Sequence, residues 1–253
     1  SINVWQDFAQ IIEGDGPSAN NDPILYEGLK YRAHGSALYL IGYEQSQLPE
    51  SVIIPDKILI NNNEYSVLGM DNGRFLVFTN DNAPRYRLIS VDPRNPQRSN
   101  WKEIIAEQPH VLSKVVLASG KILAAYDIDV MSHLYCYDMT GTKLYEVALP
   151  GQGSLQGISG DKESKEAFYT YTSFIMPRTV YSLDVENNVS EKYYAPEIDF
   201  NSDEYESYQV FFASKDGTRV PMTITHRKGI EMNGLNPTLL YGYGGFQINL
   251  TPS

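Results

Sequence analysis

Three short segments of this chain end in the same way at a spacing of 46 residues. Leu88–Asp92, Leu134–Asp138 and Val180–Asp184 each read apolar, any residue, small, apolar, Asp. A repeat of about 40–50 residues is the size of one four-stranded blade of a β-propeller. Because a single blade cannot bury both of its faces, blades must stack on one another to form a core. The repeat therefore predicts a mainly β chain built from propeller blades.

The residues around the repeated segments fit the same unit. The aligned apolar positions before each segment are Leu76, Ile122 and Phe168, and beside them Val77, Leu123 and Tyr169. A further strand is predicted after each aspartate, at residues 101–105, 143–147 and 189–193. The aspartate carboxylate can accept backbone N–H groups in the turn that follows, which is a structural role. Leu38–Glu44 resembles the matching strand of an earlier blade, so we expect about four blades in residues 1–193.

The pattern breaks after residue 193. Residues 194–206 are acidic, contain a proline and are predicted to form a linker. Residues 207–253 are predicted to be the first strands of a second domain. Strands at 208–212 and 220–225 flank a hairpin turn, and Pro237–Tyr241 is a continuous apolar run of the kind found in strands buried on both faces. The best helical candidate before this point, Trp101–Glu107, is a weak one.

The composition excludes several classes of function. The net charge is −11 and no basic stripe is present, so nucleic acid is not an expected partner. No apolar run approaches the ~20 residues of a membrane-spanning helix, so no membrane partner is expected. The single cysteine, Cys136, cannot form a disulfide within the chain and suits a reducing compartment. The histidines are too scattered for a metal site, and no cofactor is implied.

A glycine cluster, Gly242–Phe246, follows the apolar run. It completes neither a Gly-Lys-Ser/Thr phosphate loop nor a Gly-x-Gly-x-x-Gly motif. At the edge of an α/β sheet, such glycines let the backbone approach a ligand closely, and in α/β-hydrolases a loop after an early strand donates to the oxyanion hole. The cluster therefore favours the start of an α/β-hydrolase domain.

Several segments carry a resemblance to the prolyl oligopeptidase (prolyl endopeptidase) family. Leu239–Phe246 with Leu250–Pro252 is similar to the first strands of that family's catalytic domain, and Ser214–Met222 and His226–Gly229 resemble the entry into it. Pro84–Leu88 and Tyr171–Phe174 resemble its propeller. The resemblance covers about residues 57–253.

This resemblance implies a cytoplasmic serine peptidase that is a monomer in its full-length form. In the family, a seven-bladed propeller gates an α/β-hydrolase domain that cleaves short peptides after proline. Tyr243 matches the tyrosine whose hydroxyl completes the oxyanion hole, and Phe246 matches the ring that lines the proline pocket. No Gly-x-Ser-x-Gly occurs here, so the Ser–Asp–His triad is expected beyond Ser253 and this fragment is expected to be inactive alone.

Two other functions remain open at this point. Propellers also serve as protein-interaction modules without a catalytic role, and a truncated chain would keep only a structural role. After residue 206, an apolar run leads into a glycine-rich loop, and this arrangement favours the peptidase. Without further sheet partners, Leu239, Leu240 and Phe246 are expected to stay unburied and to make the isolated chain prone to aggregation.

Overall fold

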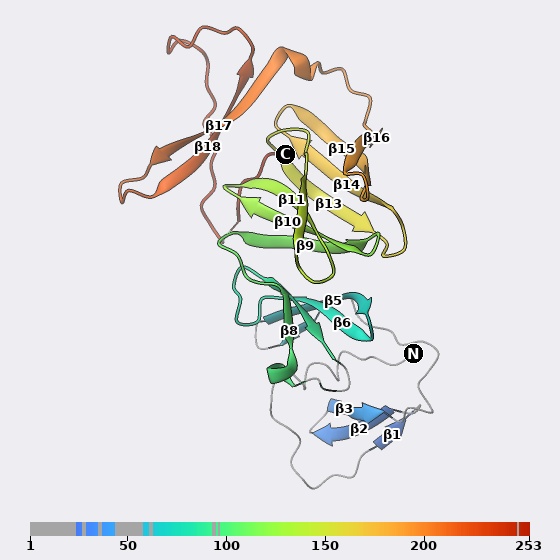
Figure 1. The fold of residues 1–253 in the computed structure, drawn as a ribbon. Coiled ribbons are helices and arrows are strands. Elements are labelled where there is room, and N and C mark those ends of the chain that lie inside the picture. The colour runs from blue at the N-terminus through green and yellow to red at the C-terminus, as the bar shows by residue number, and fades with distance from the viewer. Residues whose placement is uncertain are drawn as a thin grey trace. The chain divides into compact units, whose positions relative to one another are not determined.

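The computed structural model describes residues 63–253, apart from residues 93, 94, 96 and 247, and the backbone of four strands before residue 63 (Figure 1). The chain divides into two compact units, Ser1–Pro109 and His110–Ser253. Within the described residues, the helical structure consists of two single turns of 3-10 helix, η1 (Arg98–Asn100) and η2 (Ser202–Glu204). No helix in this part of the chain is long and apolar enough to cross a bilayer.

The first unit holds a three-stranded and a five-stranded antiparallel sheet. The three-stranded sheet has the order β1-β2-β3, and the five-stranded sheet has the order β4-β5-β6-β7-β8. Their bounds are β1 (Ile24–Tyr26), β2 (Leu29–His34), β3 (Ala37–Tyr43), β4 (Ile58–Ile60), β5 (Asn63–Asp71), β6 (Arg74–Thr79), β7 (Arg87–Val91) and β8 (Lys102–Ile105). The strand expected at 38–44 is therefore confirmed as β3, and β5–β8 form what we call the second blade.

The second unit holds two four-stranded meanders and one hairpin. We call β9–β12 the third blade and β13–β16 the fourth blade, and both are antiparallel. Their bounds are β9 (Val111–Ala118), β10 (Lys121–Ile128), β11 (Met131–Tyr137), β12 (Lys143–Val147), β13 (Ser154–Gly160), β14 (Glu166–Ser173), β15 (Met176–Asp184) and β16 (Val189–Tyr194). The hairpin consists of β17 (Tyr205–Ala213) and β18 (Arg219–Arg227) and confirms the two strands expected after residue 207.

The repeated aspartates have the structural role expected of them. In the third blade, the carboxylate of Asp138 accepts the backbone N–H groups of Thr140 and Thr142 at 2.8 and 2.9 Å. In the fourth blade, Asp184 accepts those of Glu186 and Asn187, both at 2.9 Å. Each carboxylate thus closes the turn that leads to the outermost strand of its blade.

The third blade departs from the 46-residue alignment by one residue. Val77 pairs with Ile89, and Tyr169 pairs with Tyr181, as the repeat requires. The partner of Leu123 is Cys136, one position later than the repeat places it. The alignment of Leu123 with Val77 and Tyr169 is therefore wrong by one residue, because β10 is buried along both faces and its apolar run does not fix its register.

The main core lies between the third and fourth blades. Leu134 and Cys136 of β11 pack in one buried cluster with Tyr181 and Leu183 of β15. When β11 and β15 are aligned by the 46-residue repeat, Leu134 and Cys136 fall one residue before the positions equivalent to Tyr181 and Leu183. This offset follows from stacking, because the face of one sheet meets the opposite face of the next.

Polar contacts also join the third and fourth blades. The Tyr145 hydroxyl on β12 donates a hydrogen bond to the carbonyl of Val185, just after β15. At the β9–β10 turn, the N–H groups of Ser119 and Gly120 donate to the carbonyls of Ser164 and Lys162 at 2.8 and 2.7 Å. These bonds hold the edges of the two sheets together around the apolar core.

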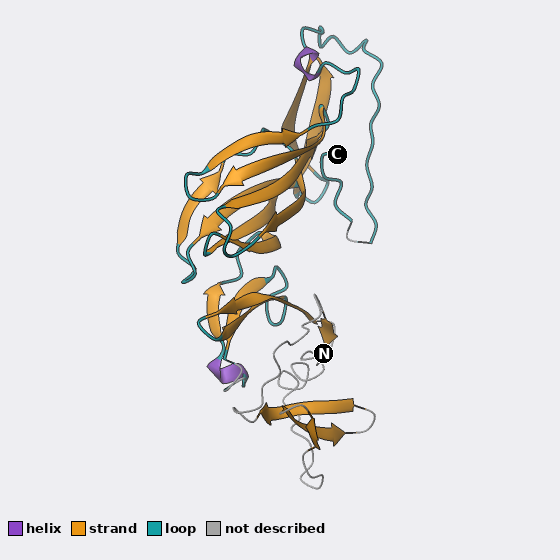
Figure 2. Ribbon diagram, turned by 90° about the vertical axis from the view of Figure 1, so that its right-hand side faces the viewer, coloured by secondary structure: helices purple, strands orange, loops and turns teal. Residues whose placement is uncertain are grey.

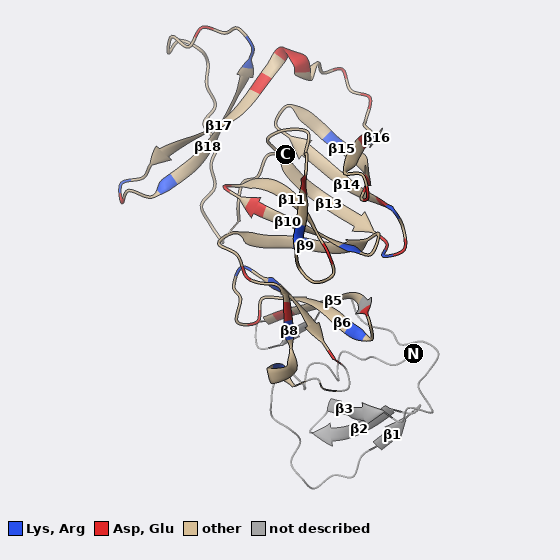
Figure 3. Cartoon of the chain, viewed as in Figure 1, with Lys and Arg blue, Asp and Glu red and all other residues tan. Residues whose placement is uncertain are grey.

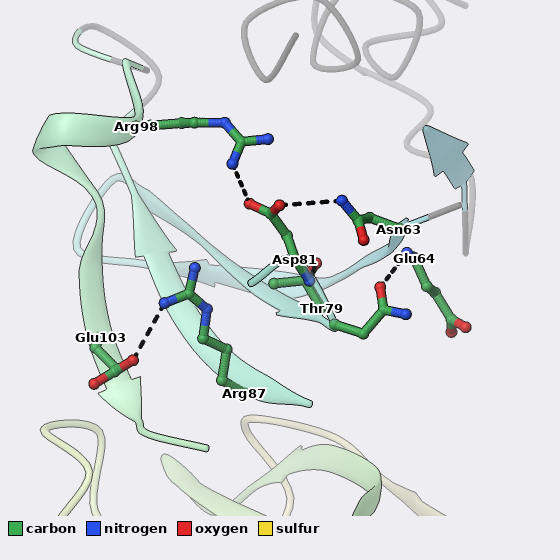
Figure 4. Close-up of polar contacts among 8 residues, drawn as sticks. Asn63, Glu64, Thr79, Asp81, Arg87, Arg98 and Glu103 are labelled. Carbon is green, nitrogen blue, oxygen red and sulfur yellow. Dashed lines mark hydrogen bonds and ion pairs between the residues drawn. The ribbon is translucent and has the colours of Figure 1, made fainter. Parts of the chain in front are cut away.

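The second blade is closed by a partly buried ion pair, shown in Figure 4. Arg98 Nη1 lies 2.6 Å from Asp81 Oδ2, and Asn63 Nδ2 donates to the other carboxylate oxygen at 3.1 Å. Burial, and then the charge of Asp81, raise the pKa of Tyr65 to about 12. The cluster ties the β6–β7 connection to the single helical turn before β8.

The weak helical candidate at 101–107 is not a helix. Lys102–Ile105 forms β8 and pairs with β7, while the nearest helical turn is η1, just upstream. Here a tertiary neighbour overrides a marginal local preference, because β7 offers unpaired backbone groups. The competing expectation of a strand at 101–105 is confirmed.

Candidate functional site

The run expected to form a buried strand, Pro237–Tyr241, is not a strand. It lies in a long loop, and Leu239 and Leu240 are 90% and 83% exposed. Figure 2 shows this part of the chain as loop without regular structure. The expectation fails because, among the described residues, no other strand lies beside the run to pair with its backbone and cover its side chains. The exposure of both leucines agrees with the expectation that they lack partners.

Tyr243 and Phe246 lie three residues apart on the same loop. Tyr243 is 49% exposed, and Phe246 is 92% exposed with a φ of 52°. The phenol of Tyr243 folds back over Gly245, where a Cβ atom would lie 3.1 Å from the hydroxyl oxygen. The atoms close to Gly245 thus belong to Tyr243, and nothing lies within 4 Å of a Cβ built at Gly242 or Gly244, so close approach of a ligand to this cluster stays a prediction. The left-handed position falls on Phe246 instead of on a glycine.

Two of the three histidines of the second unit, His133 and His226, pair with glutamates and not with these residues. His133 Nδ1 lies 2.9 Å from Glu146 Oε1, and His226 Nδ1 lies 3.5 Å from Glu206 Oε1. Neither contact includes a serine hydroxyl or a cysteine thiol. Cys136 is fully buried in the inter-blade core, and burial raises the pKa of its thiol. Within the described residues, no group of three acidic, histidine or cysteine side chains is arranged to hold a metal ion.

A shallow groove opens at the β14–β15 turn of the fourth blade. Its volume is about 380 Å³, and Phe174, Ile198 and Phe200 supply apolar walls, with Arg178 beside them. Ser253 also lines it, so residues before β17 and at the end of the chain meet at this turn. In the sequence, Phe174 stands out only as part of the Tyr171–Phe174 motif, and no pattern predicts the groove.

The charges in Figure 3 are dispersed over the blades of the second unit, and acidic residues gather around η2 at the start of β17. Asp203 and Glu204 lie in this turn, and Glu204 Oε2 is 3.5 Å from Arg227 Nη2 on β18. The acidic stretch predicted as a linker therefore leads into the base of the hairpin.

Sheets of four antiparallel strands, stacked face to face and repeating every 46 residues, define a β-propeller protein. The model of the prolyl oligopeptidase N-terminal β-propeller domain matches residues 31–196, and the chain belongs to this family. The match ends inside the predicted linker at 194–206.

Individual relatives agree with this family. The chain is 39% identical over 183 residues to a prolyl endopeptidase of Elizabethkingia miricola, covering 72% of this chain and 26% of the relative. It is 32% identical over 231 residues to a prolyl endopeptidase of Dictyostelium discoideum, covering 85% of this chain and 30% of the relative. A solved prolyl endopeptidase structure superimposes with a TM-score of 0.68 at 33% identity, covering 91% of this chain and 32% of that one. The chain thus spans about a quarter to a third of the length of these relatives.

Proposed function

We propose that this chain is the propeller side of a cytoplasmic serine peptidase that cleaves short peptides after proline. The observation that carries the proposal is the joint presence of a family-matched propeller at 31–196 and the Tyr-Gly-Tyr-Gly-Gly-Phe sequence at 241–246. The propeller would gate access to an α/β-hydrolase domain that begins near residue 207. The complete protein would act as a monomer without a cofactor.

Two residues of this chain would take part in the chemistry. The Tyr243 hydroxyl would donate a hydrogen bond to the oxyanion that forms when the scissile carbonyl is attacked, and a donor placed at that point stabilises the transition state. The Phe246 ring would offer an apolar face to the substrate proline. Tyr243 is 49% exposed and Phe246 is 92% exposed, so a substrate could reach both side chains.

The residues of the Ser–Asp–His triad are assigned to sequence beyond Ser253. Reading the gene past that codon tests this directly, since the proposal requires a Gly-x-Ser-x-Gly motif downstream. A stop codon at that point would favour an interaction module instead. The 253-residue chain by itself should show no saturable cleavage of a Gly-Pro reporter peptide, whereas the complete protein should cleave it.

Substitutions in the complete protein separate the two roles. Tyr243→Phe should lower kcat by about 10²-fold with little change in KM, because an oxyanion donor acts in the transition state. Phe246→Ala should raise KM for proline substrates. Tyr241→Phe is the matched control, because Tyr241 is a neighbouring tyrosine, 75% exposed, with no assigned role. Equal effects of Tyr241→Phe and Tyr243→Phe would refute the assignment.

A further inference from the structure

Gln209 on β17 joins the hairpin to the blades through two hydrogen bonds. Its backbone N–H donates to Gln152 Oε1 at 2.9 Å, and its side-chain Nε2 donates to the carbonyl of Asp129 at 2.6 Å. These partners are far from Gln209 in sequence, so neither bond is a local turn contact. A single glutamine thus reaches two separate segments of the blades.

Both partners lie at one end of the third blade. Asp129 and Val130 form the two-residue turn between β10 and β11, where Ile128 pairs with Met131. Gln152 lies on the connection between β12 and β13, which crosses from the third blade to the fourth. Gln209 therefore contacts the blade pair at the point where the chain passes from one sheet to the next.

The connection that carries Gln152 is itself held in place. The N–H of Ser132 on β11 donates to the carbonyl of Gly153 at 3.0 Å, and the Tyr171 hydroxyl on β14 donates to the carbonyl of Gly151. Gln152 is thus flanked by two residues anchored to different blades. Because the backbone that carries the Gln152 side chain is already held, less freedom is lost when Gln209 binds to it.

The turn that carries Asp129 is strained. Asp129 and Val130 have φ values of 50° and 62°, the left-handed conformation that a β-branched residue such as valine rarely adopts. Strained turns persist where surrounding contacts hold them. The bond from Gln209 is one such contact, because its acceptor is the carbonyl of Asp129 within this turn.

The hairpin needs an external contact to be fixed in place. Among the described strands, β17 pairs only with β18, and isolated two-stranded hairpins are marginally stable in water. Gln209 lies opposite Thr223 near the middle of the hairpin, while its N–H is bonded to the blades. The contact therefore holds the hairpin to the blades near its middle.

We propose that Gln209 is a positioning residue that latches the β17–β18 hairpin onto the third and fourth blades. The hairpin leads directly to the loop that carries Tyr243 and Phe246, so the latch would set how the propeller is held against the domain that begins there. This consequence for catalysis rests on the proposed function, whereas the latch itself does not.

Hydrogen–deuterium exchange on the complete protein tests the latch without using activity. Gln209→Ala removes the bond to Asp129, and Gln152→Ala removes the acceptor of the Gln209 N–H. Each variant should speed exchange in β17 and at residues 129–132 or 150–153 by about fivefold, and the double variant by about 25-fold if the two bonds are independent. Unchanged exchange at the blade segments in the double variant would overturn the proposal.

Ser207→Ala is the matched control, since it removes a hydrogen bond within the same hairpin. The Ser207 hydroxyl lies 2.9 Å from that of Thr225, and within the described part of the chain it makes no hydrogen bond to the blades. It should speed exchange in the hairpin only and leave residues 129–132 and 150–153 as in the wild type. A control that loosens the blade segments as much as Gln209→Ala does would show general destabilisation in place of a latch.

Peptide length gives a readout that simple destabilisation would not move. If the latch helps to keep the gate closed, Gln209→Ala should raise the ratio of cleavage of a ~30-residue proline peptide to that of a short reporter about threefold. An equal loss of cleavage rate on both substrates would refute the gating role. The latch itself would still be tested by the hydrogen–deuterium exchange measurements. Absence of proline cleavage by the wild type would instead refute the proposed function.

Discussion

Arg98 Nη1 lies 2.6 Å from the Asp81 carboxylate, whose side chain is only 3% exposed, whereas that of Arg98 is 41% exposed. The two partners therefore depend on each other unequally. If Arg98 is removed, little water can solvate the buried carboxylate. If Asp81 is removed, the arginine still has access to solvent. The same carboxylate also accepts a hydrogen bond from the Asn63 side chain.

The first prediction is that Arg98→Met destabilises the second blade more than Asp81→Asn does. We expect a loss of about 2 kcal/mol for the first, which leaves a buried charge, and about 1 kcal/mol for the second. Native-state hydrogen exchange of β5–β8 in the complete protein measures both. Glu103→Gln is the control: it breaks the more exposed pair with Arg87 at 3.3 Å and should cost under about 0.5 kcal/mol. The reverse order for Asp81 and Arg98 would contradict the argument.

The second prediction concerns acid. Hydrogen bonds, chiefly from the Thr140 hydroxyl and the Asn187 side chain, hold the pKa of Asp138 and that of Asp184 below the ordinary value of 3.8. Because the folded state favours the ionised form, this stabilisation is present above pH 3.8 and is lost as the pH falls through the lower folded-state pKa.

The variant Asp138→Asn/Asp184→Asn should therefore be less stable than the wild type at pH 6, and the difference should shrink as the pH falls below 3.8. Urea midpoints of the complete protein between pH 3 and pH 6 measure this. Glu191→Gln, an exposed charge-removing change on β16 outside both turns, is the matched control. A gap between the wild type and the double variant that widens toward low pH would be inconsistent with the turn role.

The third prediction uses the strained turn. Val130→Gly should stabilise the third blade by about 0.5–1 kcal/mol, since relief of the left-handed conformation exceeds the entropy that glycine loses on folding. Val189→Gly, at a position 48% exposed on β16, is the matched control and should destabilise by about 1 kcal/mol. Thermal unfolding of both variants decides the matter, and destabilisation by Val130→Gly would count against the strain.

The fourth prediction concerns the isolated 253-residue chain. Leu239, Leu240 and Phe246 are 90%, 83% and 92% exposed on one loop, and clustered apolar surface promotes association. The chain should aggregate at micromolar concentration, and Leu239→Lys/Leu240→Lys should reduce this severalfold. Light scattering as a function of concentration measures both. A soluble monomer with a cooperative, concentration-independent melt would contradict the prediction.

Sequence by itself determined the features that depend on near neighbours in the chain. The blade period, the turns closed by Asp138 and Asp184, and the hairpin around Asp216-Gly217 all follow from local hydrogen bonding and alternation of apolar residues. The Tyr-Gly-Tyr-Gly-Gly-Phe sequence identified the loop that carries Tyr243 and Phe246 by family resemblance. It did not place those side chains, since their surroundings are set by other segments.

Only the tertiary structure decided which distant groups meet. The register of Leu123 with Cys136 was hidden because β10 is apolar on both faces, so a shift of one residue leaves the sequence pattern unchanged. Pro237–Tyr241 reads as a buried strand, yet a strand requires a partner for its backbone and a cover for its side chains. The contacts of Asp81 with Arg98 and of Gln209 with Asp129 depend on chain closure over many residues, which leaves no local pattern in the sequence.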